Sequence, residues 1–280
     1  MKTQSCNTTS EFKLGHCFDR AKAQVGTDEA MLLATQLLGV SFTELYTERG
    51  RRLSLADVEK LKSAVQRRLC GEPIAYITGY RMFRSLDLRV SADVLIPRFE
   101  TELLVDVVIE LTSNRGRVLD LGTGSGAIAI ALSKTKELQV VAVDNDERTL
   151  QVCAENCREH EAKVELVCSN WFENVRGRFD TIVSNPPYVA ADDPHLEEGD
   201  LRFEPPAALV GGRSGLEHLE EIITSSMNFL KPGGWLVVEH GYDQQASVKK
   251  LFEDRGYLDI QHRCDYTDTP RVMWGQSRGR

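Results

Sequence analysis

The sequence predicts an α/β protein, in which a small helical region precedes a doubly wound parallel sheet. Three observations predict this fold. Apolar residues in the first 75 positions recur only at helical spacing. From residue 117 onward, short apolar runs alternate with helical segments, and a run such as residues 140–143 is typical of a strand covered on both faces. One such run enters a glycine-rich turn that opens a helix.

The helical region contains start and stop signals for at least two helices. Thr27 is the expected cap of a helix that Gly39 ends. Ser54 followed by Asp57 is a capping signature, and the helix after it is expected to stop before Gly71. Alternating apolar residues between positions 80 and 95 then predict a hairpin. The expected domains are a helical domain over residues 1–78, a β-hairpin linker over 79–97 and a sheet domain over 98–280.

The sheet domain is expected to begin with a helix over residues 100–111. Two extended runs near its end, 257–263 and 271–274, predict a final antiparallel pair at the sheet edge. Between them, the expected strands are residues 117–120, 139–144, 163–168, 179–184 and 234–240, and the expected helices are residues 127–132, 146–160, 215–230 and 244–253.

Composition narrows the class of protein. No apolar run approaches the roughly 18 to 20 residues that span a membrane, and Met1 to Thr9 lack the apolar core of a secretion signal. A cytoplasmic protein is therefore expected. The seven cysteines, Cys6 among them, form no Cys-x-x-Cys pair, so we expect no metal site. The net charge of −8 favours a protein partner over nucleic acid.

The glycine-rich turn is the first candidate site. It follows the strand ending at Asp120, and Asp144 stands at the end of the next strand, where an acid can accept hydrogen bonds from both hydroxyls of a ribose. Glycines let a ligand approach main-chain atoms. This pattern fits S-adenosylmethionine and also a nicotinamide dinucleotide, so the loop alone leaves the cofactor open. The loop consists of Gly122, Thr123, Gly124, Ser125 and Gly126.

A second motif, Asn185-Pro186-Pro187-Tyr188, follows the strand over residues 179–184. This strand and the one before the glycine loop flank the switch point of a doubly wound sheet, so both motifs are expected to face one pocket. The Asn185 side-chain carbonyl and the Pro186 main-chain carbonyl can accept both hydrogens of a planar NH2 group. Tyr188 can pack over that flat group. The motif thus predicts methylation of a planar amine, either an amide or a nucleobase.

The combination of motifs resembles the bacterial release-factor glutamine methyltransferases, the HemK/PrmC family, over nearly the whole chain. The resemblance implies S-adenosylmethionine-dependent methylation of the glutamine side-chain amide in the Gly-Gly-Gln motif of peptide chain release factors 1 and 2. It rests on both motifs above and on residues 71–79, 95–98, 101–103, 202–205, 208–209, 239–241 and 265–272.

The resemblance also implies a seven-strand, Rossmann-like S-adenosylmethionine-dependent methyltransferase domain and a helical domain that docks the substrate. A monomer is expected. Asn185, Pro186 and Tyr188 would be catalytic. The implied cofactor-binding residues are Gly122, Thr123, Gly124, Ser125, Gly126, Asp144, Trp171 and Asn185, and the implied substrate-binding residues are Asn185, Pro186, Pro187 and Tyr188.

Two positions depart from the family pattern. Phe99 replaces a proline in the segment that follows Arg98, which frees the backbone and adds a bulky ring at the expected pocket rim. Asn170 replaces an aspartate before Trp171, so any contact with an adenine amine would lack a charge. The rival activities are glutamine methylation of a ribosomal protein, methylation of a nucleobase amine and nicotinamide-dependent redox chemistry.

Overall fold

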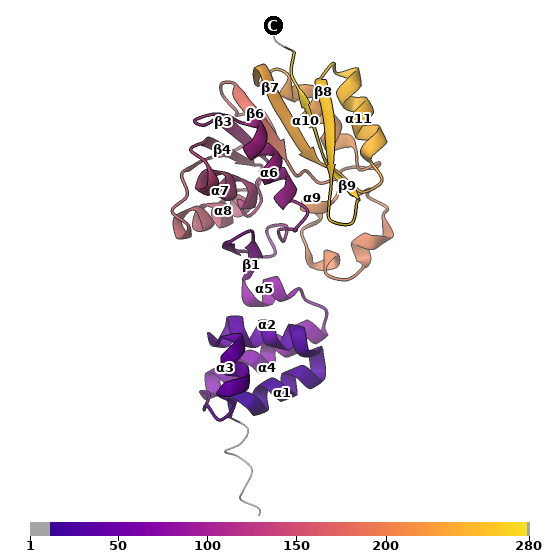
Figure 1. Ribbon diagram of the computed structural model, residues 1–280. Coiled ribbons are helices and arrows are strands. Elements are labelled where there is room, and N and C mark those ends of the chain that lie inside the picture. Colours follow the sequence, from indigo (N-terminus) through magenta and orange to yellow (C-terminus); the bar gives the residue numbers. More distant parts are fainter. Residues whose placement is uncertain (1–11, 279–280) are drawn as a thin grey trace, which may run out of the picture. The chain divides into compact units, whose positions relative to one another are not determined.

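The computed structural model describes residues 12–278, and the chain divides into two compact units, Met1–Gly79 and Tyr80–Arg280 (Figure 1). The expected polar start over Met1 to Thr9, together with Cys6, lies outside the described residues. Among the residues that the structure describes, no helix is long and apolar enough to cross a membrane, and no group of three or more His, Cys, Asp or Glu side chains could hold a metal ion.

The first unit is helical, as its apolar spacing predicted. Its described helices pack around one apolar core that includes the buried side chains of Phe18, Leu33 and Leu61. The helices are α1 (Leu14–Val25), α2 (Thr27–Leu38), α3 (Phe42–Thr47), α4 (Leu55–Leu69) and α5 (Ile74–Thr78).

Two helix caps predicted in this unit can be compared with the structure. Ser54 Oγ accepts from the Asp57 N–H at 3.1 Å and the Asp57 carboxylate accepts from the Ser54 N–H, which confirms the predicted capping box of α4. Thr27 as a cap is wrong. It is the first helical residue of α2, because Gly26, at φ 87°, makes the turn and no side chain caps the helix.

The second unit is built on a seven-stranded sheet in the order β5-β4-β3-β6-β7-β9-β8 (Figure 1). Pairing is parallel from β5 through β7, and β9 runs antiparallel to both β7 and β8. The predicted antiparallel pair at the sheet edge is thus confirmed. The strands are β3 (Arg117–Leu121), β4 (Gln139–Asp144), β5 (Val164–Cys168), β6 (Phe179–Ser184), β7 (Leu230–Glu239), β8 (Leu258–Cys264) and β9 (Pro270–Gln276).

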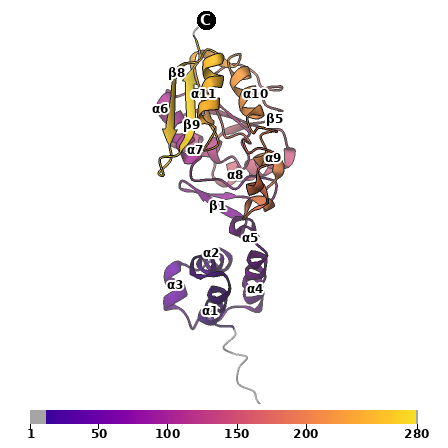
Figure 2. The same ribbon diagram turned by 90° about the vertical axis from the view of Figure 1, so that its right-hand side faces the viewer.

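Helices cover both faces of the sheet (Figure 2). Alternate residues of each strand point to opposite faces, so Val118 belongs to the core cluster with α6, α7 and α8, whereas Leu119 belongs to the cluster with α10 and α11. The covering helices are α6 (Glu102–Leu111), α7 (Ala127–Thr135), α8 (Glu147–Glu159), α10 (Glu217–Ser226) and α11 (Gln245–Asp254).

The expected hairpin consists of β1 (Tyr80–Phe83) and β2 (Leu86–Arg89) and forms a separate two-stranded sheet. Phe83 and Leu88 are buried in the same core cluster as α6 and α7. The hairpin therefore packs as part of the second unit, and the assignment of residues 79–97 as a linker stays a prediction. The last residues of the alternating pattern, 90–95, form no strand.

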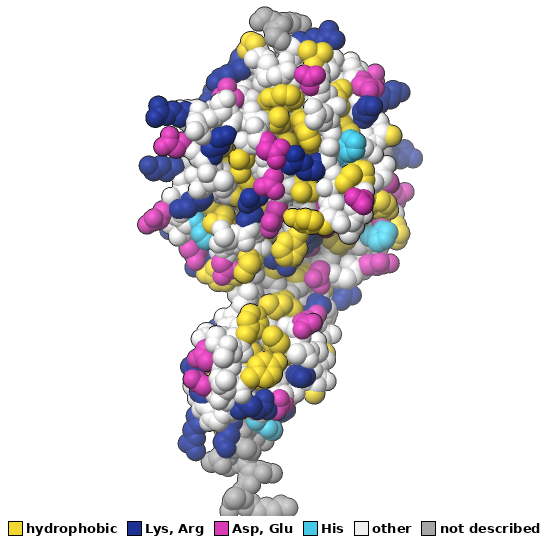
Figure 3. All heavy atoms as spheres, viewed as in Figure 1, with side chains coloured by type: hydrophobic (Ala, Val, Ile, Leu, Met, Phe, Trp, Pro, Cys, Tyr) yellow, Lys and Arg dark blue, Asp and Glu magenta, His cyan; other side chains and the backbone are white. Residues whose placement is uncertain are grey.

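The segment between β6 and α10 has short helices that carry no periodic apolar pattern in the sequence. They are η1 (Pro194–Glu197), η2 (Leu201–Phe203) and α9 (Pro206–Leu209). On the face shown in Figure 3, basic and acidic side chains are interspersed between apolar patches.

Candidate functional site

The glycine-rich segment turns the chain from β3 into α7. The N–H groups of Gly122 and Thr123 both donate to the Val143 carbonyl at 2.9 Å, which fastens the loop to β4. A Cβ added to Gly124 would meet no atom within 4 Å, whereas one on Gly126 would lie 2.7 Å from Cys153 Sγ. Gly124 therefore leaves open space beside the loop, and Gly126 lets the start of α7 pack against α8.

Two acids flank this loop and have different surroundings. Asp144, at the end of β4, accepts from the Gly124 N–H at 3.1 Å, and burial raises the pKa of its carboxyl. Asp120 is fully buried, which raises its pKa to about 7, and Oδ2 accepts from the Thr123 hydroxyl at 2.7 Å. Asp120 thus stabilises the loop from the buried side through Thr123, whereas Asp144 lies on the side of the loop that faces the cavity.

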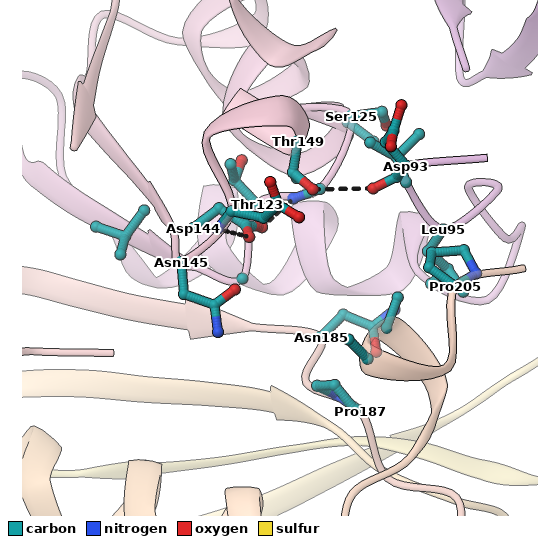
Figure 4. Close-up of a pocket in the computed structure, with 18 of the residues that line it drawn as sticks. Asp93, Leu95, Thr123, Ser125, Asp144, Asn145, Thr149, Asn185, Pro187 and Pro205 are labelled. Atoms are coloured by element: carbon teal, nitrogen blue, oxygen red, sulfur yellow. Dashed lines mark hydrogen bonds between the residues drawn. The ribbon is translucent and has the colours of Figure 1, made fainter. Parts of the chain in front are cut away.

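A cavity of about 420 Å³ lies at the carboxyl ends of the parallel strands. It joins the glycine loop to the Asn-Pro-Pro-Tyr segment, and Figure 4 shows Thr123 and Asp144 on one side with Asn185 and Pro187 on the other. This volume falls within the roughly 300–1,000 Å³ of small-molecule sites. The predicted residues that line it are Gly122, Thr123, Gly124, Ser125, Asp144, Trp171, Asn185 and Pro187, whereas Gly126, Pro186 and Tyr188 are not among the lining residues.

The side-chain amide of Asn185 contacts Thr101, which lies in one of the segments that carry the family resemblance but was not among the predicted site residues. Its Nδ2 donates to the Thr101 hydroxyl oxygen at 3.0 Å. Thr101 directly precedes α6 and is only 4% exposed. Because the amide nitrogen is engaged with Thr101, the carbonyl oxygen Oδ1 is the end of Asn185 that remains available in the cavity.

Tyr188 does not line the cavity, and its hydroxyl group is bonded to a buried carboxyl group instead. Its hydroxyl donates to Glu239 Oε1 at 3.1 Å, and its ring packs against the core cluster beside α10 and α11. Burial raises the pKa of Tyr188, so the phenol stays neutral. Glu239, the last residue of β7, is 1% exposed, and burial raises its pKa to about 7. The aromatic contact expected between Tyr188 and a flat substrate group stays a prediction.

Trp171 and Asn170 lie at the end of the cavity near β5. The Trp171 ring lies 5.3 Å from the His218 ring, tilted by 57°, and a Cβ on Gly122 would contact it at 3.6 Å. Asn170 Nδ2 donates to Glu173 Oε1 at 3.1 Å. Its amide nitrogen is thus engaged by a neighbour on its own turn, and the contact with an adenine amine stays a prediction.

An ion pair closes another side of the cavity. Arg98, a lining residue, donates to Glu204 Oε1, and Glu204 Oε2 accepts from the Ile96 N–H at 2.9 Å. The Glu204 side chain is fully buried. Phe99, the departure from the family pattern, is 63% exposed, and its ring lies 4.9 Å from the Arg81 guanidinium carbon. The two segments that this pair joins are 106 residues apart in the sequence.

Comparison with known proteins decides the family. Residues 16–79 match the PrmC N-terminal domain, and residues 98–198 match the methyltransferase small domain. The chain is 42% identical over 253 residues to the release factor glutamine methyltransferase of Aliivibrio fischeri, which covers 89% of each chain. It is 45% identical over 253 residues to that of Salmonella typhimurium, covering 89% of this chain and 91% of the relative. The chain belongs to the release factor glutamine methyltransferase family.

Solved structures agree with this fold. A methyltransferase from Pyrococcus furiosus superposes with a TM-score of 0.56 at 19% identity, covering 78% of this chain and 99% of the other. At that identity the likeness shows the fold alone. The present methyltransferase thus combines a methyltransferase sheet domain with an amino-terminal helical domain of the family type, as the sequence predicted.

Three buried polar residues of this methyltransferase support the site without belonging to either sequence motif. Thr101 and Glu239 form hydrogen bonds with the first and last residues of the Asn-Pro-Pro-Tyr segment. Asn156, on α8, is fully buried and donates to the Ser125 carbonyl at 2.8 Å and to the Arg89 carbonyl at 3.0 Å. Asn156 therefore ties the glycine loop to the hairpin, and its only local signal is a polar residue on the apolar face of a helix.

Proposed function

We propose that this enzyme transfers the methyl group of S-adenosylmethionine to the side-chain amide nitrogen of the glutamine in the Gly-Gly-Gln motif of peptide chain release factors 1 and 2. One observation carries the proposal. Asn185 is held by Thr101 so that its carbonyl oxygen is free in the same cavity as the glycine loop. Family membership supports the choice of a glutamine amide over a nucleobase, since the relatives are named for that substrate.

The residues around the glycine loop fit S-adenosylmethionine. The open space beside Gly124 admits a ligand against the main chain. Asp144 lies at the strand end, where a carboxylate can accept hydrogen bonds from ribose hydroxyls. Trp171 provides an aromatic surface for adenine at the far side of the loop. When bound, S-adenosylmethionine would supply a methyl group on a positively charged sulfur.

The chain's own part in the reaction is to hold an amide. An amide nitrogen is a weak nucleophile because its lone pair is delocalised into the carbonyl. Asn185 Oδ1 would accept one hydrogen of the substrate NH2, and the main-chain carbonyl of Pro186 would accept the other. No described residue donates a hydrogen bond to that Pro186 carbonyl. Two acceptors fix the plane of the NH2 group, and positioning of this kind supplies up to roughly 7–11 kcal/mol.

The test offers methyl-labelled S-adenosylmethionine with one acceptor at a time. We expect label on a release factor that carries Gly-Gly-Gln, and none on the same factor with Gly-Gly-Glu, because the carboxylate has no NH2. Label on a ribosomal protein or on nucleic acid, with none on the release factor, would overturn the proposal. The mixed surface charges in Figure 3 offer no continuous basic stripe for nucleic acid on that face.

The variant Asn185→Ala tests the amide clamp itself. We expect methyl transfer to fall by at least about 100-fold, the size of effect seen when one positioned hydrogen-bonding group is removed. Binding of S-adenosylmethionine should change little, because the glycine loop and Asp144 are untouched. The matched control is Asn228→Ala, at an exposed position outside the cavity, which should keep full activity. An active Asn185→Ala variant would refute the clamp. The cytoplasmic location and the monomeric state stay predictions.

A further inference from the structure

An imidazole ring lies at the Trp171 end of the cavity, where neither sequence motif placed one. His218 lines the cavity from the first turn of α10, and it is the only one of the described histidines that does so. Its ring centroid lies 5.3 Å from that of Trp171, and the two planes are inclined at 57°. No described residue forms a hydrogen bond or an ion pair with the His218 side chain. Two aromatic rings therefore meet at this end of the cavity.

Trp171 has a backbone conformation that few residues other than glycine adopt. Its φ is 43°, in the left-handed region. The Ser169 hydroxyl donates to the Trp171 carbonyl at 3.1 Å and accepts from the Asn174 N–H at 2.9 Å, so the turn is held in this form. The next residue, Phe172, is buried and stacks on Phe229. Left-handed residues of this kind cluster at ligand sites, and this turn leaves the tryptophan ring at the cavity.

Backbone contacts fix the positions from which both rings extend. The indole lies against the glycine loop, where a Cβ built on Gly122 would lie 3.6 Å from its six-membered ring. Gly215 comes just before α10, and its carbonyl accepts from Gln244 Nε2 at 3.3 Å. The same nitrogen donates to the Tyr188 carbonyl at 2.9 Å. The start of α10, which carries His218, is thus tied to the Asn-Pro-Pro-Tyr segment.

The position of Asp144 indicates which part of the cofactor these rings would meet. Its carboxylate fits the ribose hydroxyls, as argued above, and its main-chain carbonyl accepts from the Ser169 N–H at 2.9 Å. The turn that carries Trp171 therefore begins beside the ribose end of the cavity. Asn185 lies on another side of the cavity, where the methyl group is needed (Figure 4). The base attached to that ribose thus falls at the end with the two rings.

We propose that His218 is a cofactor-binding residue that forms, together with Trp171, an aromatic wall for the adenine ring of S-adenosylmethionine. Adenine is flat and stacks on aromatic side chains through its π face. The separation and tilt of the two rings are typical of a packed aromatic pair, so each ring helps to hold the other. His218 contributes its flat ring to the wall. The inference rests on the proposed function for its cofactor alone, and it holds whichever protein is methylated.

Binding of S-adenosylhomocysteine, measured by calorimetry without a methyl acceptor, tests the wall. We expect His218→Ala to raise the Kd about 3- to 10-fold, the effect of losing one aromatic contact. His218→Phe keeps a flat ring and should stay within about twofold of the wild type. His218→Asn keeps polar atoms without the ring and should resemble alanine. The matched control is His262→Ala, at an exposed position of β8 outside the cavity, which should bind normally.

A second ligand, 5′-methylthioadenosine, locates the contact, because it carries the adenosine of the cofactor without the amino-acid end. His218→Ala should weaken the binding of both ligands by the same factor. A loss confined to S-adenosylhomocysteine would place His218 at the amino-acid end and overturn the proposal. Trp171→Leu should also weaken both ligands. Because the two rings form one surface, the double variant should lose less affinity than the product of the two single effects. Effects that multiply fully would contradict a shared wall.

The result is separable from the proposed function. If the wild type binds S-adenosylhomocysteine but does not label a release factor, the proposed substrate fails and the wall stands. If His218→Ala binds both ligands as the wild type does, only the wall fails. An asparagine variant that keeps affinity beside a phenylalanine variant that loses it would replace the ring with a hydrogen bond and also refute the wall. Urea midpoints equal to that of the wild type show that each variant is folded. Should His218→Ala unfold, the asparagine and phenylalanine variants decide the question.

Discussion

Gly126→Ala should destabilise the second unit by an amount that the structure lets us calculate. Gly126 has φ 85° and precedes α7 as its cap residue. A non-glycine residue in the left-handed region costs about 1–2 kcal/mol. The new Cβ would also lie 2.7 Å from Cys153 Sγ and 3.0 Å from Ile130 Cδ1, and overpacking a core of this kind costs about 1–3 kcal/mol. The total is about 2–5 kcal/mol.

Urea unfolding followed by tryptophan fluorescence measures this loss. All three tryptophans, Trp171, Trp235 and Trp274, lie in the second unit, so the signal reports that unit alone. With a urea m-value of about 2–3 kcal/mol per molar, the midpoint should fall by about 0.7–2.5 M. The transition must be fitted for this unit by itself, because two units need not unfold together.

Gly124→Ala is the matched control, since the same backbone strain occurs there without the clash. Its φ is 56° and a Cβ would meet nothing within 4 Å, so it should lose only about 1–2 kcal/mol. It should instead weaken S-adenosylmethionine binding, because the methyl group enters the cavity. A double-mutant cycle tests the clash. In the Cys153→Ala background, Gly126→Ala should lower the free energy of unfolding by about 1–3 kcal/mol less than it does in the wild type. Equal midpoints for the two alanine variants would refute the packing argument.

Three further predictions address buried or capped groups. Arg98→Ala leaves Glu204 buried and unpaired and should cost the second unit about 3 kcal/mol by urea unfolding. The folded pKa of Asp120, about 7, exceeds the unfolded value of about 3.9, so its contribution to stability is lost as the pH rises between these values. Asp120→Asn should therefore flatten the decline of stability between about pH 4 and pH 7, measured as urea midpoints. Ser54→Ala should cost the first unit about 1 kcal/mol, visible by hydrogen exchange in α4.

The sheet of the second unit was predictable because its signals are local. Each parallel strand is a short apolar run, and the residues at its carboxyl end must reach the same edge of the sheet whatever the loops do. The glycine loop and Asn185 could thus be placed in one pocket from their positions after β3 and β6. The helix cap at Ser54 was predictable for the same reason, since both partners lie within one turn.

The contacts of the supporting residues were not predictable, although Thr101 and Glu239 lie in segments that carry the family resemblance, because their partners are distant in the sequence. Thr101 and Asn185 are separated by 84 positions, Tyr188 and Glu239 by 51, and Asn156 bonds to a residue 67 positions away. Nothing in a single sequence distinguishes a threonine that orients an amide from one that ends a loop. The short helices between residues 194 and 209 were not predicted for another reason. Proline and turn geometry, rather than apolar spacing, determine where they form.

A site that holds a neutral amide through an asparagine side chain must fix the orientation of that side chain, a requirement that a charged carboxylate or ammonium group does not impose. An asparagine presents a donor and an acceptor of nearly the same shape, and the two orientations differ only in what the neighbours accept or donate. A neighbour that can do both, such as a lone hydroxyl, does not choose between them. In this structure the Thr101 hydroxyl oxygen accepts from Asn185 Nδ2 at 3.0 Å, which leaves Asn185 Oδ1 as the end that faces the cavity. The polarity of the clamp therefore depends on Thr101 acting as an acceptor, rather than as a donor, in this one contact.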